Sequence, residues 1–221
     1  MIIDRKTYIE KLQRSKGNGL IKIITGLRRS GKSFLLKKLF RQHLLDDGVN
    51  EDHILIIDME SRKNKAFKDP DYLLDWVESK MLDDSTYYII IDEVQEVNDF
   101  VEVLSTLSVT EGTDVYVTGS NSRFLSSDVV TEFRGRGDEI HVWPLSFKEF
   151  MSVYESNKED GWAEYLMYGG LPQLLTQDGD EKKADFLRRL YRTVYLRDIY
   201  ERNNIELKPE FEELSKTIAS S

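Results

Sequence analysis

The eight residues from Gly26 to Ser33 read Gly-Leu-Arg-Arg-Ser-Gly-Lys-Ser, and no other feature constrains the fold of this chain as strongly. They match the phosphate-binding loop pattern G-x-x-x-x-G-K-[ST] at every fixed position. Such a loop needs a strand before it and a helix after it, and residues 20–25 and 34–45 predict both. Its backbone N–H groups surround anionic oxygens, and the N-terminus of the helix adds partial positive charge. The sequence therefore predicts a nucleoside triphosphate site.

Two side chains of this loop have the chemistry that phosphate and metal binding require. Lys32 supplies a cation for the outer phosphates, and the Ser33 hydroxyl can ligate Mg²⁺. Arg28 and Arg29 are assigned no catalytic role, because they either face outward toward a partner or brace neighbouring segments. The predicted nucleotide-binding segment consists of Gly26, Leu27, Arg28, Arg29, Ser30, Gly31, Lys32, Ser33 and Phe34.

Composition excludes several other classes of protein. The 221 residues suffice for one good-sized domain, or for one domain with a small appendage, and 40% of them are hydrophobic. With no cysteine, the chain has no disulfide, thiolate metal site or thiol nucleophile. The net charge of -9 argues against a surface coated in basic patches. No stretch is apolar enough to cross a bilayer. We therefore expect a cytoplasmic protein with no membrane partner.

Strand and helix patterns alternate through the first two thirds of the chain, which favours a parallel sheet covered on both faces. Beyond Pro144 the strand-like runs stop and amphipathic helical patterns follow. We expect a core over 1–144 and a helical region over 145–221, and the last residues resemble a helix cut off in progress, as in a piece of a longer protein. Strands are predicted at 53–58, 87–91, 115–118 and 139–142, and helices at 4–13, 69–81, 99–107, 146–156, 162–168 and 182–202.

Two carboxylates follow the strand predicted at 87–91. Asp92 can hold Mg²⁺ through its water shell, and Glu93 can orient and deprotonate an attacking water. Both can face one site because the chain turns where a strand ends. The glutamate also argues against a GTPase, and the string Asn-Lys-Ala-Phe at 64–67 lacks the aspartate of the guanine-reading N-K-x-D sequence. The sequence therefore favours attack of water on ATP.

Three later segments offer further candidates. Ser120 or Asn121, after the strand at 115–118, is placed to contact the γ-phosphate, although Gly, Ser and Asn are also typical of plain turns. Arg136 can stabilise charge that develops on the γ-phosphate, or it lies in a solvated hairpin. Residues 187–199 mix basic and aromatic side chains. Their helical spacing favours a packed helix with a solvated arginine face over a nucleic-acid interface.

Taken together, these residues resemble a bacterial and archaeal group of AAA+-type ATPases that join an ATPase domain to a C-terminal domain of unknown function. The likeness covers nearly the whole chain. The double arginine of the loop and the string PLSFKEF are its specific parts, because ordinary phosphate-loop proteins share neither. The strings that carry it are ITGLRRSGKS at 24–33, IDEVQ at 91–95, TGSNS at 118–122, PLSFKEF at 144–150, YGGLP at 168–172 and TVYLRDI at 193–199.

The resemblance implies an α/β P-loop NTPase core with strand order 5-1-4-3-2, a helical lid after Pro144 and Mg²⁺-dependent ATP hydrolysis. It also favours Arg136 as the arginine near the nucleotide, acting within one chain or across a homo-oligomer. Two alternatives stay open: an interaction protein gated by nucleotide with negligible turnover, and an ATPase stimulated by nucleic acid. Whether the chain has a nucleic-acid or protein partner is left open by the sequence.

Overall fold

The computed structural model describes residues 2–119, 137–196, 199–200, 206 and 208–219. The chain divides into two compact units, residues 1–176 and 177–221. The predicted boundary near Pro144, between the core and the helical region, stays a prediction.

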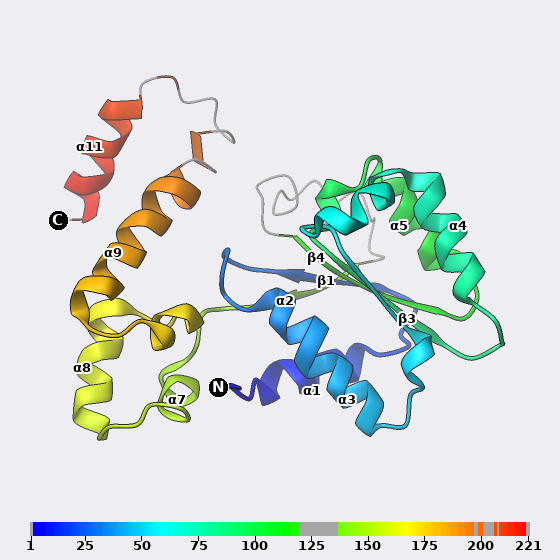
Figure 1. Ribbon diagram of the computed structural model, residues 1–221, viewed down its shortest axis with the longest axis horizontal. Helices are drawn as coiled ribbons and strands as arrows, with labels where there is room; N and C mark the ends of the chain where they lie inside the picture. The colour runs from blue at the N-terminus through cyan, green and yellow to red at the C-terminus, as the bar shows by residue number, and fades with distance from the viewer. Residues whose placement is uncertain (1, 120–136, 197–198, 201–205, 207, 220–221) are drawn as a thin grey trace. The chain divides into compact units, whose positions relative to one another are not determined.

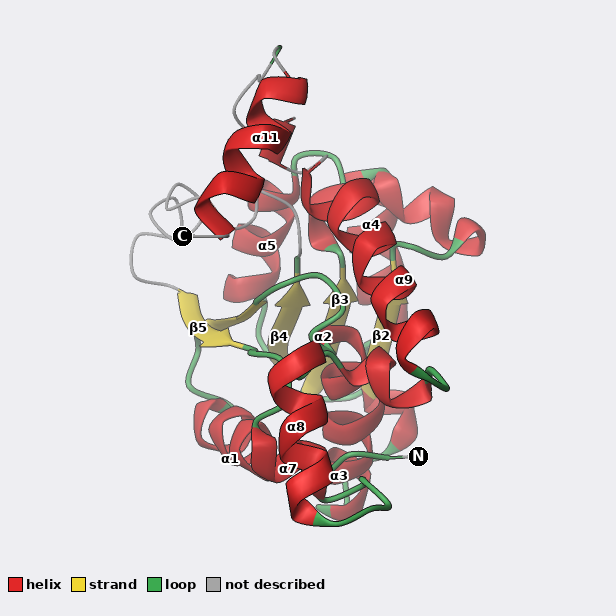
Figure 2. Ribbon diagram, turned by 90° about the vertical axis from the view of Figure 1, so that its left-hand side faces the viewer, coloured by secondary structure: helices red, strands yellow, loops and turns green. Residues whose placement is uncertain are grey.

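A parallel sheet of five strands forms the centre of the first unit. The strands lie side by side in the order β2-β3-β4-β1-β5, which confirms the predicted order (Figure 2). Because all five are parallel, their carboxyl ends meet at one edge, where ligands bind in sheets of this kind. The strands are β1 (Ile21–Thr25), β2 (Ile54–Asp58), β3 (Tyr87–Asp92), β4 (Thr113–Thr118) and β5 (Gly137–His141).

Helices cover both faces of this sheet (Figure 1). Successive residues of β3 point to opposite faces, so Ile89 and Ile91 join one core while Tyr88 and Ile90 join the other. Because both faces of the sheet are buried, the strands read as nearly continuous apolar runs. One face carries α1 (Lys6–Ser15), α2 (Lys32–Phe34), η1 (Leu35–Phe40) and α3 (Arg41–Asp46), and the other carries α4 (Pro70–Lys80) and α5 (Phe100–Val109).

Local signals set several of these boundaries. The Asp69 side chain accepts a hydrogen bond from the Tyr72 backbone N–H at 3.0 Å, and Pro70 occupies the first position of α4. The helix that follows the loop is continuous from residue 32 to 46, with one π-helical stretch, η1, inside it. Three 3-10 helices between α3 and α5 were not predicted: η2 (Glu51–His53), η3 (Arg62–Lys68) and η4 (Val94–Glu96).

The helices after β5 differ from the prediction in their ends. The helix expected over 146–156 is α7 (Phe147–Met151), and the one expected from residue 162 is α8 (Lys158–Tyr168). Asn157 accounts for both differences, because its side chain accepts from the Asp160 N–H at 2.8 Å and so starts a new helix there. A last short helix, η5 (Pro172–Thr176), ends the first unit.

The second unit is helical in the residues that are described. The helix predicted over 182–202 corresponds to α9 (Asp180–Leu190) and η6 (Tyr191–Tyr195), and parts of its end, residues 197–198 and 201–202, lie outside the described residues. The helix α11 (Lys208–Ala219) follows. None of the helices in the described part of the chain has the length and apolarity needed to span a membrane.

Candidate functional site

The loop between β1 and α2 has a backbone conformation that only glycine allows at one position. Gly26 has φ +134°, and a Cβ atom there would lie 2.2 Å from the carbonyl oxygen of Val142. Val142 is held in place by its own N–H, which donates to the Thr25 carbonyl at 2.8 Å. Arg29 also has a positive φ, +67°, and left-handed backbone of this kind clusters at functional sites. Gly26, the first glycine of the sequence pattern, is therefore required because any side chain there would collide with the Val142 carbonyl.

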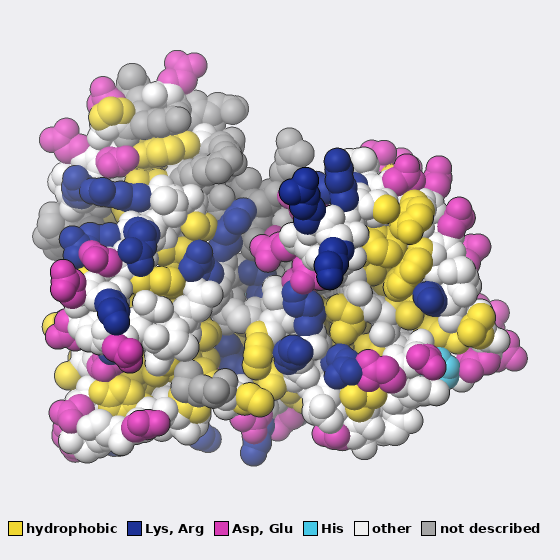
Figure 3. Space-filling model, viewed as in Figure 1, with side chains coloured by type: hydrophobic (Ala, Val, Ile, Leu, Met, Phe, Trp, Pro, Cys, Tyr) yellow, Lys and Arg dark blue, Asp and Glu magenta, His cyan; other side chains and the backbone are white. Residues whose placement is uncertain are grey.

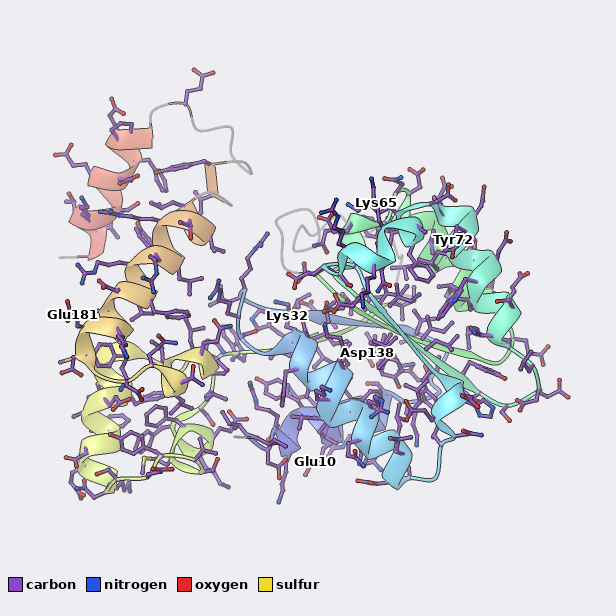
Figure 4. The ribbon with its side chains drawn as sticks, in the orientation of Figure 1. Glu10, Lys32, Lys65, Tyr72, Asp138 and Glu181 are labelled. Atoms are coloured by element: carbon purple, nitrogen blue, oxygen red, sulfur yellow. The ribbon has the colours of Figure 1, made fainter. Side chains whose placement is uncertain are left out.

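Lys32 lies at the start of α2, beside this loop (Figure 4). Its ammonium donates to the carbonyls of Gly26 and Leu27, at 3.0 Å each. Burial lowers the pKa of Lys32 below the ordinary value for lysine, while the nearby carboxylates of Glu93 and Asp92 oppose that shift. A bound anion would offset the same desolvation, so the site is better suited to an anion than to a neutral ligand.

Asp92, at the end of β3, joins the loop to the neighbouring strand. Its side chain is 1% exposed, and its Oδ1 accepts from the Ser33 hydroxyl at 2.8 Å and from the Thr118 hydroxyl at 2.5 Å. Ser33 and Asp92, both predicted as metal ligands, therefore lie together. Hydroxyl and carboxylate oxygens suit Mg²⁺, which keeps several waters and takes its other ligands from phosphates. Among the described residues no group of three or more His, Cys, Asp or Glu is arranged to hold a metal.

Glu93 turns out of the strand immediately after Asp92. Its backbone is left-handed, with φ +57°, and its N–H donates to the Thr118 hydroxyl at 3.0 Å. The Gln95 amide donates to its Oε2 at 2.5 Å. This geometry matches the turn that the sequence predicts at the end of the strand.

A cavity of about 450 Å³ lies beside the loop. Lys32, Ser33 and Glu93, which the sequence assigns to phosphate binding, metal binding and catalysis, line its polar part. Apolar side chains line the remainder, including Phe34, which is 43% exposed. A pocket with a few converging polar groups and an apolar wall is typical of small-molecule sites. The other apolar lining residues are Ile3, Leu145 and Pro172.

A second cavity of about 530 Å³ borders Glu93, and Arg62, Lys65 and Lys68 contribute to its lining. These cations belong to η3. Figure 3 shows Lys and Arg side chains gathered over this segment, and Figure 4 labels Lys65 in the same orientation. Lys68 pairs with Glu96 at 2.8 Å. Because Glu60, Glu93 and Glu96 line the same cavity, the cations of η3 offset a group of carboxylates at this edge of the candidate site.

Sequence reasoning missed Lys37 and Asp58. The Lys37 ammonium lies 2.7 Å from Oδ2 of Asp92 and 2.8 Å from Oδ2 of Asp58. Burial alone would lower the pKa of Lys37, but hydrogen bonds to Asp58 and Asp92 outweigh it and raise the pKa above the ordinary value. Two signals were available: Lys37 follows Ser33 by four residues on one helix, and Asp58 ends the strand next to β3.

Arg5 was also missed, and no local signal points to it. This side chain is 5% exposed, donates to the carbonyls of Ser30 at 3.2 Å and Trp143 at 2.8 Å, and lies 2.8 Å from the Glu149 carboxylate. A second arginine, Arg29, donates to the Gln173 side chain at 2.8 Å. Both arginines tie the phosphate-binding loop to the helical segment that ends the first unit.

The remaining predicted site residues have different positions. Ser30 is buried in the loop, and Leu27 is 46% exposed. Arg28 lines both cavities. The γ-phosphate candidates Ser120 and Asn121, and the candidate arginine Arg136, lie outside the described residues.

Two family models match the chain. One, described as "AAA domain", matches residues 18–151, and the other, a "Domain of unknown function (DUF8612)", matches residues 159–221. An uncharacterized protein of Haemophilus influenzae is 33% identical over 211 residues, which is 93% of this chain and 52% of that protein. Uncharacterized protein MJ1544 of Methanocaldococcus jannaschii is 28% identical, over 84% of this chain and 43% of its own length. The chain thus spans about half the length of these curated relatives.

Among solved structures, the Aeropyrum pernix ORC1 protein in complex with DNA aligns with a TM-score of 0.50. The alignment covers 92% of this chain and 62% of that one, at 13% identity. At this identity the likeness shows a shared fold and nothing further.

Proposed function

We propose that this chain, which belongs to the AAA domain family, binds ATP together with Mg²⁺ and hydrolyses it. The observation that carries the proposal is the convergence on Asp92. Ser33 from the phosphate-binding loop and Thr118 from β4 both hydrogen-bond its carboxylate, and Glu93 stands next to it. Three segments far apart in the sequence thus meet at the carboxyl edge of the sheet, where ligands bind in such folds.

Each residue of the site has a separate role in the proposed reaction. Lys32 and the loop N–H groups hold the phosphates, and Ser33 and Asp92 hold the metal, which supplies charge neutralisation when bound. Glu93 accepts the proton of a water whose oxygen forms a bond to the γ-phosphorus. The bond from that phosphorus to the bridging oxygen of ADP breaks, so the products are ADP and inorganic phosphate.

Two further assignments rest on sequence alone. We assign Asn121, or Ser120 in its place, to contact the γ-phosphate, and Arg136 to stabilise charge that develops there. The 450 Å³ cavity has an apolar wall that includes Phe34 and Pro172, and this supports placing the adenine base of ATP against that wall.

The experiment that tests this proposal measures ATP binding by calorimetry and ATP turnover by phosphate release. Lys32→Ala should lose binding and turnover, whereas Glu93→Gln should keep binding and lose turnover. Glu96→Gln is the matched control, because Glu96 is a half-exposed carboxylate that pairs only with Lys68 among the interactions described. Failure of the wild-type chain to bind ATP at millimolar concentration would refute the proposal.

The same assay separates the alternatives. Turnover per chain that rises with protein concentration would mean that a second copy completes the site, with Arg136 as the candidate residue in trans. Binding with no turnover above that of Glu93→Gln would favour a nucleotide-gated interaction protein. A salt-sensitive rise in turnover on adding nucleic acid would favour a nucleic-acid-stimulated ATPase.

A further inference from the structure

The carboxylate assigned to the metal already has a cation beside it in this chain. Ser33 and Lys37 lie four residues apart on the helix that leaves the phosphate-binding loop, so both side chains reach Asp92. Ser33 donates to Oδ1, while the Lys37 ammonium lies 2.7 Å from Oδ2. The Lys37 ammonium therefore lies next to Oδ2 of Asp92, the oxygen that accepts no hydrogen bond from Ser33 or Thr118.

A second carboxylate is within reach of the same ammonium. Asp58 ends β2 directly opposite Asp92 in the register of the parallel pair β2–β3. Its Oδ2 lies 2.8 Å from the Lys37 ammonium, and its side chain is 35% exposed, compared with 1% for Asp92. Lys37 thus bridges one buried and one solvated carboxylate.

The backbone around Lys37 is also unusual. It lies in η1, a π-helical stretch inside an otherwise α-helical segment. Such insertions occur frequently at functional sites, where they alter which way the following side chains point. Lysine suits this position because its ammonium is a compact charge on a flexible four-carbon stem, so it can exchange partners without backbone movement.

We propose that Lys37 is a resident counter-cation for the metal site. It neutralises Asp92 when no metal is bound, and it moves fully onto Asp58 when Mg²⁺ enters with the nucleotide. This inference rests on the proposed function, because it concerns the same nucleotide and metal. Lys37 acts through Asp92 and is a positioning residue.

The consequence is a weakened dependence of nucleotide affinity on Mg²⁺. Without the metal, Lys37 shields the ATP phosphates from a buried carboxylate of like charge. With the metal, Lys37 competes with Mg²⁺ and its bound waters for Asp92. Both effects lower the ratio of the ATP dissociation constant in EDTA to the one in Mg²⁺, which is the coupling between metal and nucleotide.

Calorimetric titration of ATP into the full chain, in EDTA and in saturating Mg²⁺, measures that ratio without any turnover. Lys37→Met should raise it about fivefold or more, at the lower end of typical coupling between two ligands. Lys38→Met is the matched control, because it removes the same charge from the exposed neighbouring position and should leave the ratio unchanged. Lys37→Gln is a second variant, should Lys37→Met fold poorly.

Asp58 provides a test of opposite sign. Asp58→Asn should lower the ratio of the ATP dissociation constant in EDTA to that in Mg²⁺. Without the Asp58 carboxylate, Lys37 has no second anionic partner and stays on Asp92 when Mg²⁺ competes for it. In the Lys37→Met background the same substitution should change the ratio less than about twofold, since residues that share a partner are not additive. If Asp58 and Lys37 instead act independently, the effects of Asp58→Asn and Lys37→Met on the ratio should be additive in free energy.

The outcomes distinguish this inference from the proposed function. Equal ratios for Lys37→Met and Lys38→Met, in a chain that binds ATP, would overturn the inference alone. Additivity of the Asp58 and Lys37 substitutions would overturn the exchange between carboxylates. Absence of ATP binding by the wild-type chain would overturn the proposed function, and this inference with it.

Discussion

Truncating Arg5 should destabilise the first unit strongly, although this residue lies outside every sequence motif. Its guanidinium is 5% exposed and contacts two backbone carbonyls, the Glu149 carboxylate and the ring of Tyr8, which lies 4.5 Å below it. Glu149 keeps its hydrogen bonds from the Ser146 backbone and hydroxyl, so it would lose its cation but not all its partners.

The expected cost can be estimated from these contacts. Removing one partner of a buried ion pair costs about 3–5 kcal/mol, and the partners that Glu149 retains favour the lower value of about 3 kcal/mol. With a urea slope of about 2–3 kcal/mol per molar for a chain of this size, Arg5→Ala should lower the unfolding midpoint by about 1 M. ATP affinity should also fall, because the Ser30 carbonyl of the loop loses its donor.

Urea unfolding followed by tryptophan fluorescence measures the change. Arg14→Ala is the control: Arg14 is 81% exposed and 4.0 Å from Glu10, so its loss should change stability by about 0.5 kcal/mol or less. A cycle with Glu149→Gln isolates the pair, and its coupling should be about 1–3 kcal/mol. A cost for Arg5→Ala no greater than that of Arg14→Ala would refute the reasoning.

Two further predictions concern the loop and its surroundings. Gly26→Ala should abolish ATP binding in calorimetry, because its methyl group would lie 2.2 Å from the Val142 carbonyl, whereas Gly17→Ala, with φ +69° but open space around it, should cost about 1–2 kcal/mol and leave ATP binding intact. The pKa of Glu60 is raised by burial and by the carboxylates of Glu93 and Asp92, so its ionised form disfavours the folded state. Glu60→Gln should therefore stabilise the chain more at about pH 7.5 than at about pH 4. The gain should grow as pH rises from the ordinary glutamate pKa to the raised one and then stay constant, and equal gains at both pH values would contradict this reasoning.

The sequence was sufficient to locate the candidate site residues that local patterns mark, and the roles assigned to them stay predictions. The loop from Gly26 to Ser33 and the pair Asp92–Glu93 each occupy one continuous segment, and the apolar strands before them are long enough to recognise. The strand order was confirmed too, but it came from resemblance, because no local pattern encodes which strands become neighbours.

What was missed depends on contacts between distant segments. Arg5 and Trp143 are 138 residues apart, and no spacing rule connects a residue before α1 to a carbonyl after β5. Lys37 and Asp58 were overlooked for another reason. The four-residue spacing from Ser33 to Lys37 is visible in the sequence, but the contact of Lys37 with both Asp58 and Asp92 appears only when β2 and β3 pair in register.

A comparison of the two edges of the sheet supports the assignment of function to one of them. At the amino edge, the buried Lys22 pairs with Asp114, whose Oδ2 also accepts from the Tyr116 hydroxyl at 2.9 Å and the Gly17 N–H at 3.0 Å. Both charges there are fully enclosed and neither lines a cavity described for this chain, so this pair specifies the packing of β1 against β4. At the carboxyl edge, by contrast, Lys32 and Glu93 line a cavity of about 450 Å³. Buried charge is common to both edges, and the access of a ligand to it is what separates a binding site from a structural ion pair.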